Sequence, residues 1–158
     1  MHAGSRRRVG RASARWAAAA AVLLSVSGAA QGLAAEAGVN SMKIRMMVNG
    51  REVTATLDDT PIARDFAALL PLKLTLTDYA STEKVSDLPR RLNPAGAPPG
   101  YDPSVGDITY YAPWGNLAIF YRDFGYASGL IKLGTIDAGL EALQQSGALS
   151  TTMETVAP

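Results

Sequence analysis

The side chains that could do chemistry in this chain are mainly aromatic, because the common catalytic groups are missing from most of it. There is no cysteine, and the single histidine is His2. Eight of the ten aromatic residues beyond position 35 lie between Tyr101 and Tyr126. Tyr and Trp combine a large apolar surface with a polar tip, which suits a surface that is partly exposed to solvent. This clustering predicts either a core wall or the lining of a binding groove.

The candidate binding residues lie in and near this aromatic segment. Under the period-two alternation of strands, some of its rings face the core and others face outward. Trp114 lies in a Pro-Trp-Gly-Asn turn, and turns often carry function. Two adjacent arginines could hold a carboxylate or a peptide carbonyl, although arginines at a strand end are commonly just solvated. We therefore expect the ligand-binding residues to be Tyr111, Trp114, Phe120, Tyr121, Arg90 and Arg91.

Four aspartates offer an alternative site for acid–base chemistry or Ca²⁺. They lie near Pro or Gly, or at an expected helix start, where turn and cap roles are favoured. The glycines near position 130 lack the spacing of a phosphate-binding loop. We expect no catalytic residue, no metal and no cofactor. The four aspartates are Asp102, Asp107, Asp123 and Asp137.

Residues 1–35 have the three-part layout of a secretory signal peptide. Five arginines precede the apolar run 16–26, which is too short to span a bilayer comfortably. Small residues follow the apolar run, and they fit signal-peptide cleavage after Ala30 or after Ala34. The exact cleavage site stays open between Ala30 and Ala35. Residues 5–9 also resemble a twin-arginine signal, so the export route stays open. An uncleaved anchor is the alternative to the periplasmic or secreted protein that we expect.

Loss of this leader changes the charge of the protein. Five of the 15 basic residues and none of the 14 acidic residues lie in it, which leaves 10 and 14, or a net charge of −4. A mildly acidic domain without a basic cluster is unsuited to nucleic acid. The absence of cysteine excludes disulfides and thiolate catalysis, and the absence of imidazole excludes a histidine triad. We also expect no membrane partner after cleavage.

The remaining residues suffice for one domain, and their pattern is mainly β. Asn49-Gly50 predicts a type I′ hairpin turn. Thr60 as N-cap with Pro61 predicts a first short helix, and Asp137 as cap predicts a second over 138–145. Four prolines and two glycines in 93–103 argue against regular structure there. Alternating or apolar runs predict strands at 44–48, 53–57, 72–76, 84–88, 107–111, 117–121, 130–136 and 152–156. Many short strands with two short helices favour a closed or nearly closed barrel.

The order of these passages resembles the cyclophilin-like proteins. Residues 55–69 are similar to the strand-Pro-helix passage near a cyclophilin start, and residues 130–143 to a later strand and helix. The Gly-Asp…Tyr…Phe-Tyr hairpin from Gly106 is similar to that of the bacterial cyclophilin-like family. The resemblance covers Met42 to Val156. It implies a cyclophilin-like domain over 42–157, mainly β, with a closed eight-stranded barrel and two short helices.

One departure bears on activity. The isomerases carry Phe-His-Arg on the strand after the first helix, whereas residues 71–79 contain neither His nor Arg. Lys73 lacks the planar donor fork of an arginine. The resemblance therefore implies an exported, non-catalytic domain whose aromatic groove binds a peptide, small molecule or partner protein. The alternative is a weak or atypical peptidyl-prolyl isomerase that uses Arg90, Arg91, Arg122 or Lys73.

Overall fold

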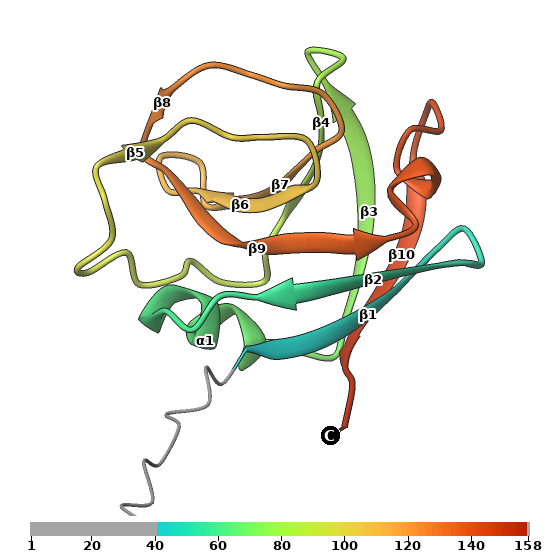
Figure 1. Cartoon of the computed structure of the whole chain (residues 1–158), viewed down its shortest axis with the longest axis horizontal. Coiled ribbons are helices and arrows are strands. Elements are labelled where there is room, and N and C mark those ends of the chain that lie inside the picture. The colour runs from blue at the N-terminus through green and yellow to red at the C-terminus, as the bar shows by residue number, and fades with distance from the viewer. Residues whose placement is uncertain (1–40, 158) are drawn as a thin grey trace, which may run out of the picture. The chain divides into compact units, whose positions relative to one another are not determined.

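Eight antiparallel strands form a closed barrel in the computed structural model, which describes residues 41–157 (Figure 1). The order around the barrel is β1-β10-β3-β4-β7-β6-β9-β2, so the predicted eight-stranded barrel is confirmed. The predicted leader lies outside the described residues. Within residues 41–157, no helix has the length and apolarity needed to cross a membrane. The barrel strands are β1 (Met42–Val48), β2 (Arg51–Leu57), β3 (Leu72–Tyr79), β4 (Glu83–Asp87), β6 (Asp107–Tyr111), β7 (Asn116–Phe120), β9 (Leu130–Ala138) and β10 (Leu149–Thr155).

The first hairpin forms as the local sequence predicts. Strands β1 and β2 pair along their whole length, from Met42 opposite Leu57 to Val48 opposite Arg51 next to the turn. The turn residues Asn49 and Gly50 have φ angles of 47° and 78°, the positive values that a type I′ turn requires. The Asn49 carboxamide also accepts a hydrogen bond of 2.9 Å from the backbone of Ser150, which ties the turn to β10.

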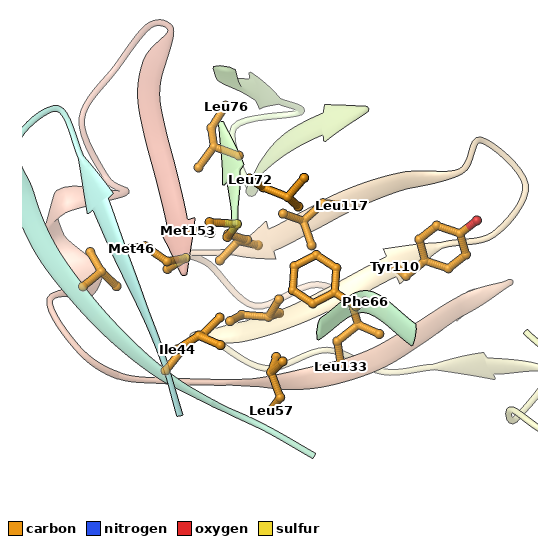
Figure 2. Close-up of a cluster of buried hydrophobic side chains, with 14 of the residues drawn as sticks. Ile44, Met46, Leu57, Phe66, Leu72, Leu76, Tyr110, Leu117, Leu133 and Met153 are labelled. Atoms are coloured by element: carbon orange, nitrogen blue, oxygen red, sulfur yellow. The ribbon is translucent and has the colours of Figure 1, made fainter. Parts of the chain in front are cut away.

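Helix α1 (Pro61–Ala67) begins at the predicted cap. The Thr60 hydroxyl accepts a hydrogen bond of 3.3 Å from the backbone N–H of Ala63. Ile62, Ala63 and Phe66 form the buried face of the helix. Figure 2 shows the Phe66 ring pointing into the middle of the labelled core side chains. The helix therefore supplies one large apolar group to the interior of the barrel.

The predicted second helix is wrong. Strand β9 continues to Ala138, and only a 3-10 turn, η1 (Leu140–Ala142), follows. The Asp137 carboxylate does not cap a helix, because it accepts hydrogen bonds from Lys43 Nζ at 3.0 Å and from the Thr56 hydroxyl. Gly139 then turns the chain with a φ of 85°, and a Cβ there would lie 2.5 Å from the Glu52 carbonyl oxygen. Close contact with β2, not local helix propensity, decides this segment.

A two-stranded sheet lies outside the barrel in Figure 1, made of β5 (Gly100–Tyr101) and β8 (Ala127–Ser128). The expectation of no regular structure in 93–103 is therefore wrong at β5. Gly100 permits the pairing, because a Cβ at this position would lie 2.4 Å from the Tyr126 hydroxyl and 2.6 Å from the Ala127 carbonyl oxygen.

Strand β7 is buried on both faces. Leu117 and Ile119 belong to the barrel core, whereas Ala118 and Phe120 pack outside it with Leu130. Tyr101 of β5 and Ala127 of β8 pack against this outer cluster. A strand that is covered on both faces has a continuous apolar sequence, and Leu117–Phe120 is such a sequence. The small outer sheet thus creates a second apolar layer next to the candidate site.

Candidate functional site

A cavity of about 230 Å³ opens on the outer face of the barrel, over strands β3, β4, β6 and β7. Its position follows from strand alternation, because Ile108, Tyr110, Leu117 and Ile119 point into the core and their neighbours point outward. We call it the aromatic cavity. It is lined by Tyr79, Glu83, Val85, Tyr111, Trp114, Asn116, Ala118, Phe120, Phe124, Ala127 and Leu130.

Aromatic rings form most of its rim. Trp114 is 58% exposed, and its ring meets Tyr111 edge-on, with centroids 5.2 Å apart and planes at 85°. Tyr79 contacts the same indole at 5.5 Å and 81°. The ring centroids of Phe120 and Phe124, which also line the cavity, lie 6.0 Å apart. Rings held at near right angles make a corner, which presents both ring faces and ring edges to a ligand.

Two polar side chains stand among these rings. Glu83 is half-buried, and burial raises the pKa of its carboxyl, while a hydrogen bond from the Thr82 hydroxyl opposes the change. Asn116 is 5% exposed, and its Nδ2 donates to the Leu117 carbonyl at 3.3 Å. Its Oδ1 is buried and has no hydrogen-bond partner in residues 41–157. Sequence analysis did not single out either residue as part of the site, although Asn116 is the last residue of the Pro-Trp-Gly-Asn turn that carries Trp114.

The structure brings together three of the six predicted ligand-binding residues. Tyr111, Trp114 and Phe120 all line the aromatic cavity, with Phe120 almost fully buried. Sequence analysis did not predict Tyr79, although its outward position at the end of the alternating strand β3 was a usable signal.

The other three predicted residues do not line this cavity. The Tyr121 hydroxyl donates to the Asp78 carboxylate at 2.9 Å. Arg90 forms a salt bridge of 2.6 Å with Asp65 of helix α1. Arg91 donates from Nη1 to the Ala112 carbonyl at 2.8 Å and so supports the turn that carries Trp114. The two arginines are therefore engaged with the fold in different places.

A buried lysine near the end of the barrel was also not anticipated. Lys84 pairs with Ile119, so it faces the interior, and its side chain is 0% exposed. Its Nζ donates to the carbonyls of Gln145 at 2.6 Å and Gly147 at 3.1 Å and forms a salt bridge of 2.8 Å with Asp78. Each charge is thus compensated, and the arrangement fastens the 145–147 turn to the barrel.

The four aspartates do not converge. Asp107 is 2% exposed and accepts from Tyr101 at 2.8 Å and from the backbone of Ser104 at 2.9 Å, with Lys132 Nζ 3.0 Å away. Asp123 accepts from the backbone of Val105 at 3.2 Å. No group of three or more His, Cys, Asp or Glu suited to a metal ion occurs in the described part of the chain.

A second cavity of about 260 Å³ lies between the start of helix α1, the 95–101 loop and β9. Tyr101 and Lys132 line it, and both already interact with the buried Asp107 carboxylate. No buried side-chain N or O atom of this second cavity lacks a hydrogen-bond partner within residues 41–157, in contrast to Asn116 Oδ1 of the aromatic cavity.

Comparison with known proteins agrees with this architecture. Among solved structures, the solution structure of a hypothetical protein from Archaeoglobus fulgidus is similar, with 20% identity and a TM-score of 0.57 over 77% of this chain and 99% of that chain. At this identity the likeness shows the fold alone. No curated protein matches the chain. Residues 46–154 match the family model described as the cyclophilin-like family, and the chain therefore belongs to that family.

Proposed function

We propose that this protein is an exported, non-catalytic binding domain whose aromatic cavity holds an apolar or aromatic part of a peptide, small molecule or partner protein. The observation that carries the proposal is Trp114, an exposed indole held in place by Tyr79 and Tyr111 at the mouth of a cavity. Aromatic anchors of this kind dominate the energy of many binding sites. Covering roughly 100 Å² of such surface contributes about 2.5 kcal/mol, before the loss of motion on binding is counted.

The surroundings of the cavity support binding rather than catalysis. A prolyl isomerase needs a preorganised donor directed at the substrate amide. The outward positions of β3 carry Lys73, Thr75, Thr77 and Tyr79, so this strand offers no arginine. Arg90 is paired with Asp65, and Arg91 is bonded to the turn carbonyls. Fold and activity separate readily in this way, because function depends on the site that a fold carries.

Export is proposed from the leader. Its basic start, short apolar run and small residues are the features that secretion machinery recognises. A binding domain that works outside the cytoplasm is consistent with a cysteine-free chain, which needs no particular redox environment.

A thermal-shift screen of the purified protein against peptides and metabolites tests the binding proposal, because a ligand that binds the folded state raises its melting temperature. We expect hits to stabilise the wild type and to lose their effect in Trp114→Ala. Tyr126→Ala is the matched control, since Tyr126 is equally exposed but lies outside the cavity lining. Hits that stabilise Trp114→Ala as much as the wild type would place binding elsewhere.

A further inference from the structure

Asn116 lines the aromatic cavity, and its buried Oδ1 has no hydrogen-bond partner in residues 41–157. This oxygen is also closed off from solvent, so it offers no acceptor to a ligand in the cavity. The acidic group that can meet a ligand there is the Glu83 carboxylate.

Glu83 points to the charge of the ligand. Its half-buried carboxylate lines the same cavity and makes no salt bridge within the described residues. Within residues 41–157, only the Thr82 hydroxyl donates a hydrogen bond to the Glu83 side chain. A partly desolvated carboxylate without a counter-ion attracts a cation, because pairing offsets the lost hydration. The predicted mature chain, with its net charge of −4, adds a weak general attraction for cations.

The aromatic rim favours the same kind of ligand. Tyr79, Tyr111 and Trp114 surround the mouth with rings at near right angles. The face of an aromatic ring is negative, and Trp binds cations best of the three aromatic residue types. An organic cation gains from these rings twice, once through its apolar part and once through its charge.

A second hollow extends the site. It shares Val85, Trp114 and Asn116 with the aromatic cavity, so the indole and the carboxamide stand between the two spaces. Its volume is about 340 Å³, and its remaining lining is polar: Thr75, Thr77, Ser86 and Asp87. A ligand whose charged end lies by Glu83 therefore has room for a polar tail beyond Trp114.

From these observations we propose that the aromatic cavity binds an alkylammonium group that carries N–H donors. The Glu83 carboxylate is its counter-ion, and Tyr79, which pairs with Glu83 across β3 and β4, and Trp114 pack against its apolar part. The group belongs either to a free organic amine or to a lysine side chain of a peptide. This inference rests on the proposed binding function and specifies its ligand class.

Calorimetric titration of the purified protein with matched probes tests the inference. Phenethylammonium carries the charge and the donors, phenethyl alcohol only a hydroxyl, 3-phenylpropanoate a negative charge, and trimethylphenethylammonium a charge without N–H. We expect phenethylammonium to bind at least about tenfold more tightly than the alcohol, which corresponds to about 1.4 kcal/mol. The carboxylate should bind most weakly, and the quaternary amine should lie between the alcohol and phenethylammonium.

Equal affinity for the ammonium and the alcohol would overturn the cation proposal while leaving the binding function intact. Failure of every probe to bind would overturn both. A blocked Ala-Lys-Ala peptide, compared with Ala-norleucine-Ala, distinguishes the two sources of the ammonium. Tighter binding of the lysine peptide than of phenethylammonium identifies a protein ligand, and the reverse order identifies a free amine.

Variants locate the recognition. Glu83→Gln should reduce the preference for ammonium over alcohol to less than about threefold without changing the affinity for the alcohol. Glu141→Gln is the charge-matched control on the exposed 3-10 turn. An unchanged preference in Glu83→Gln would contradict the assigned counter-ion.

Discussion

Tyr110 and Tyr111 are adjacent in the chain but serve opposite faces of β6. The Tyr110 ring is buried in the barrel core, and its hydroxyl oxygen accepts a hydrogen bond of 3.1 Å from the backbone of Leu92. Tyr111 faces outward and packs against Trp114. The same residue type is therefore core on one side and a candidate ligand contact on the other, and the pleat of the strand decides which.

The same alternation gives a stability prediction for β3. Leu74 is partly buried and packs against the barrel core, whereas Lys73 is exposed on the other face. We predict that Leu74→Ala lowers the free energy of unfolding by about 2–3 kcal/mol, the lower part of the range for such truncations. Lys73→Ala should change it by less than about 0.5 kcal/mol. Denaturant titration measures both, and equal effects would show that the assigned strand phase is wrong.

At the scale of elements, local signals predicted local structure. The Asn49-Gly50 turn and the Thr60-Pro61 helix start depend on a few neighbouring residues, and both form as expected. The helix predicted after Asp137 does not form, because the Asp137 carboxylate contacts Lys43 and Thr56, which are distant in sequence. Pairing of β5 with β8 likewise depends on the distant Ala127.

The candidate site shows the same division. The Trp114 turn and the aromatic strands were visible in the sequence, which also predicted that they form one strand-turn-strand unit. Glu83 and Asn116 became apparent only from tertiary structure, because their significance lies in missing partners. No sequence pattern records that a polar atom is buried without a hydrogen bond.

The polar cluster around Lys84 yields a pH prediction. The pKa of Asp78 lies below its ordinary value of 3.8, first because Lys84 donates to it, with further hydrogen bonds from Tyr121 and Gly147. A carboxyl group with a lowered pKa in the folded state stabilises the fold above its unfolded pKa. That stability is lost as the pH falls through the folded pKa.

We therefore predict that Asp78→Asn lowers stability by about 1–3 kcal/mol at pH 7, because a buried cation loses its charged partner. The gap from wild type should narrow as the pH falls below 3.8. Denaturant midpoints over a pH series measure this change. Asp102→Asn removes the same charge from an exposed loop and should have little effect. A gap for Asp78→Asn that stays constant into acid would contradict the assignment.

At the scale of the whole molecule, the cyclophilin-like barrel is present without the arginine of the isomerases on β3. Rotation about a peptide bond faces a barrier of about 18–20 kcal/mol. A preorganised donor contributes about 3–4 kcal/mol, or two to three decades of rate.

We predict negligible prolyl isomerase activity in a protease-coupled assay with a proline tetrapeptide. The measured rate should match the uncatalysed rate, because within residues 41–157 no arginine lines the aromatic cavity. Robust catalysis that Arg90→Ala or Arg91→Ala abolishes would contradict the binding-domain proposal and identify that arginine as the donor. Arg122→Ala and Lys73→Ala cover the two remaining candidates.

The leader predicts how the exported protein begins. We expect material from the periplasm or medium to start between Gln31 and Glu36, because both candidate cleavage sites fall within this stretch. Intact-mass measurement identifies the first residue. Recovery of chains that keep Met1 in the membrane pellet would instead support an uncleaved anchor.

Acrylamide quenching of Trp114 fluorescence tests the binding site most directly. The chain has two tryptophans, so Trp16→Phe leaves Trp114 as the only emitter. We predict that the free protein is quenched readily, since the indole is 58% exposed, and that a saturating stabilising ligand from the thermal-shift screen shields it. An indole that is already shielded in the free protein, or that is quenched equally with ligand bound, would contradict the aromatic cavity as the binding site.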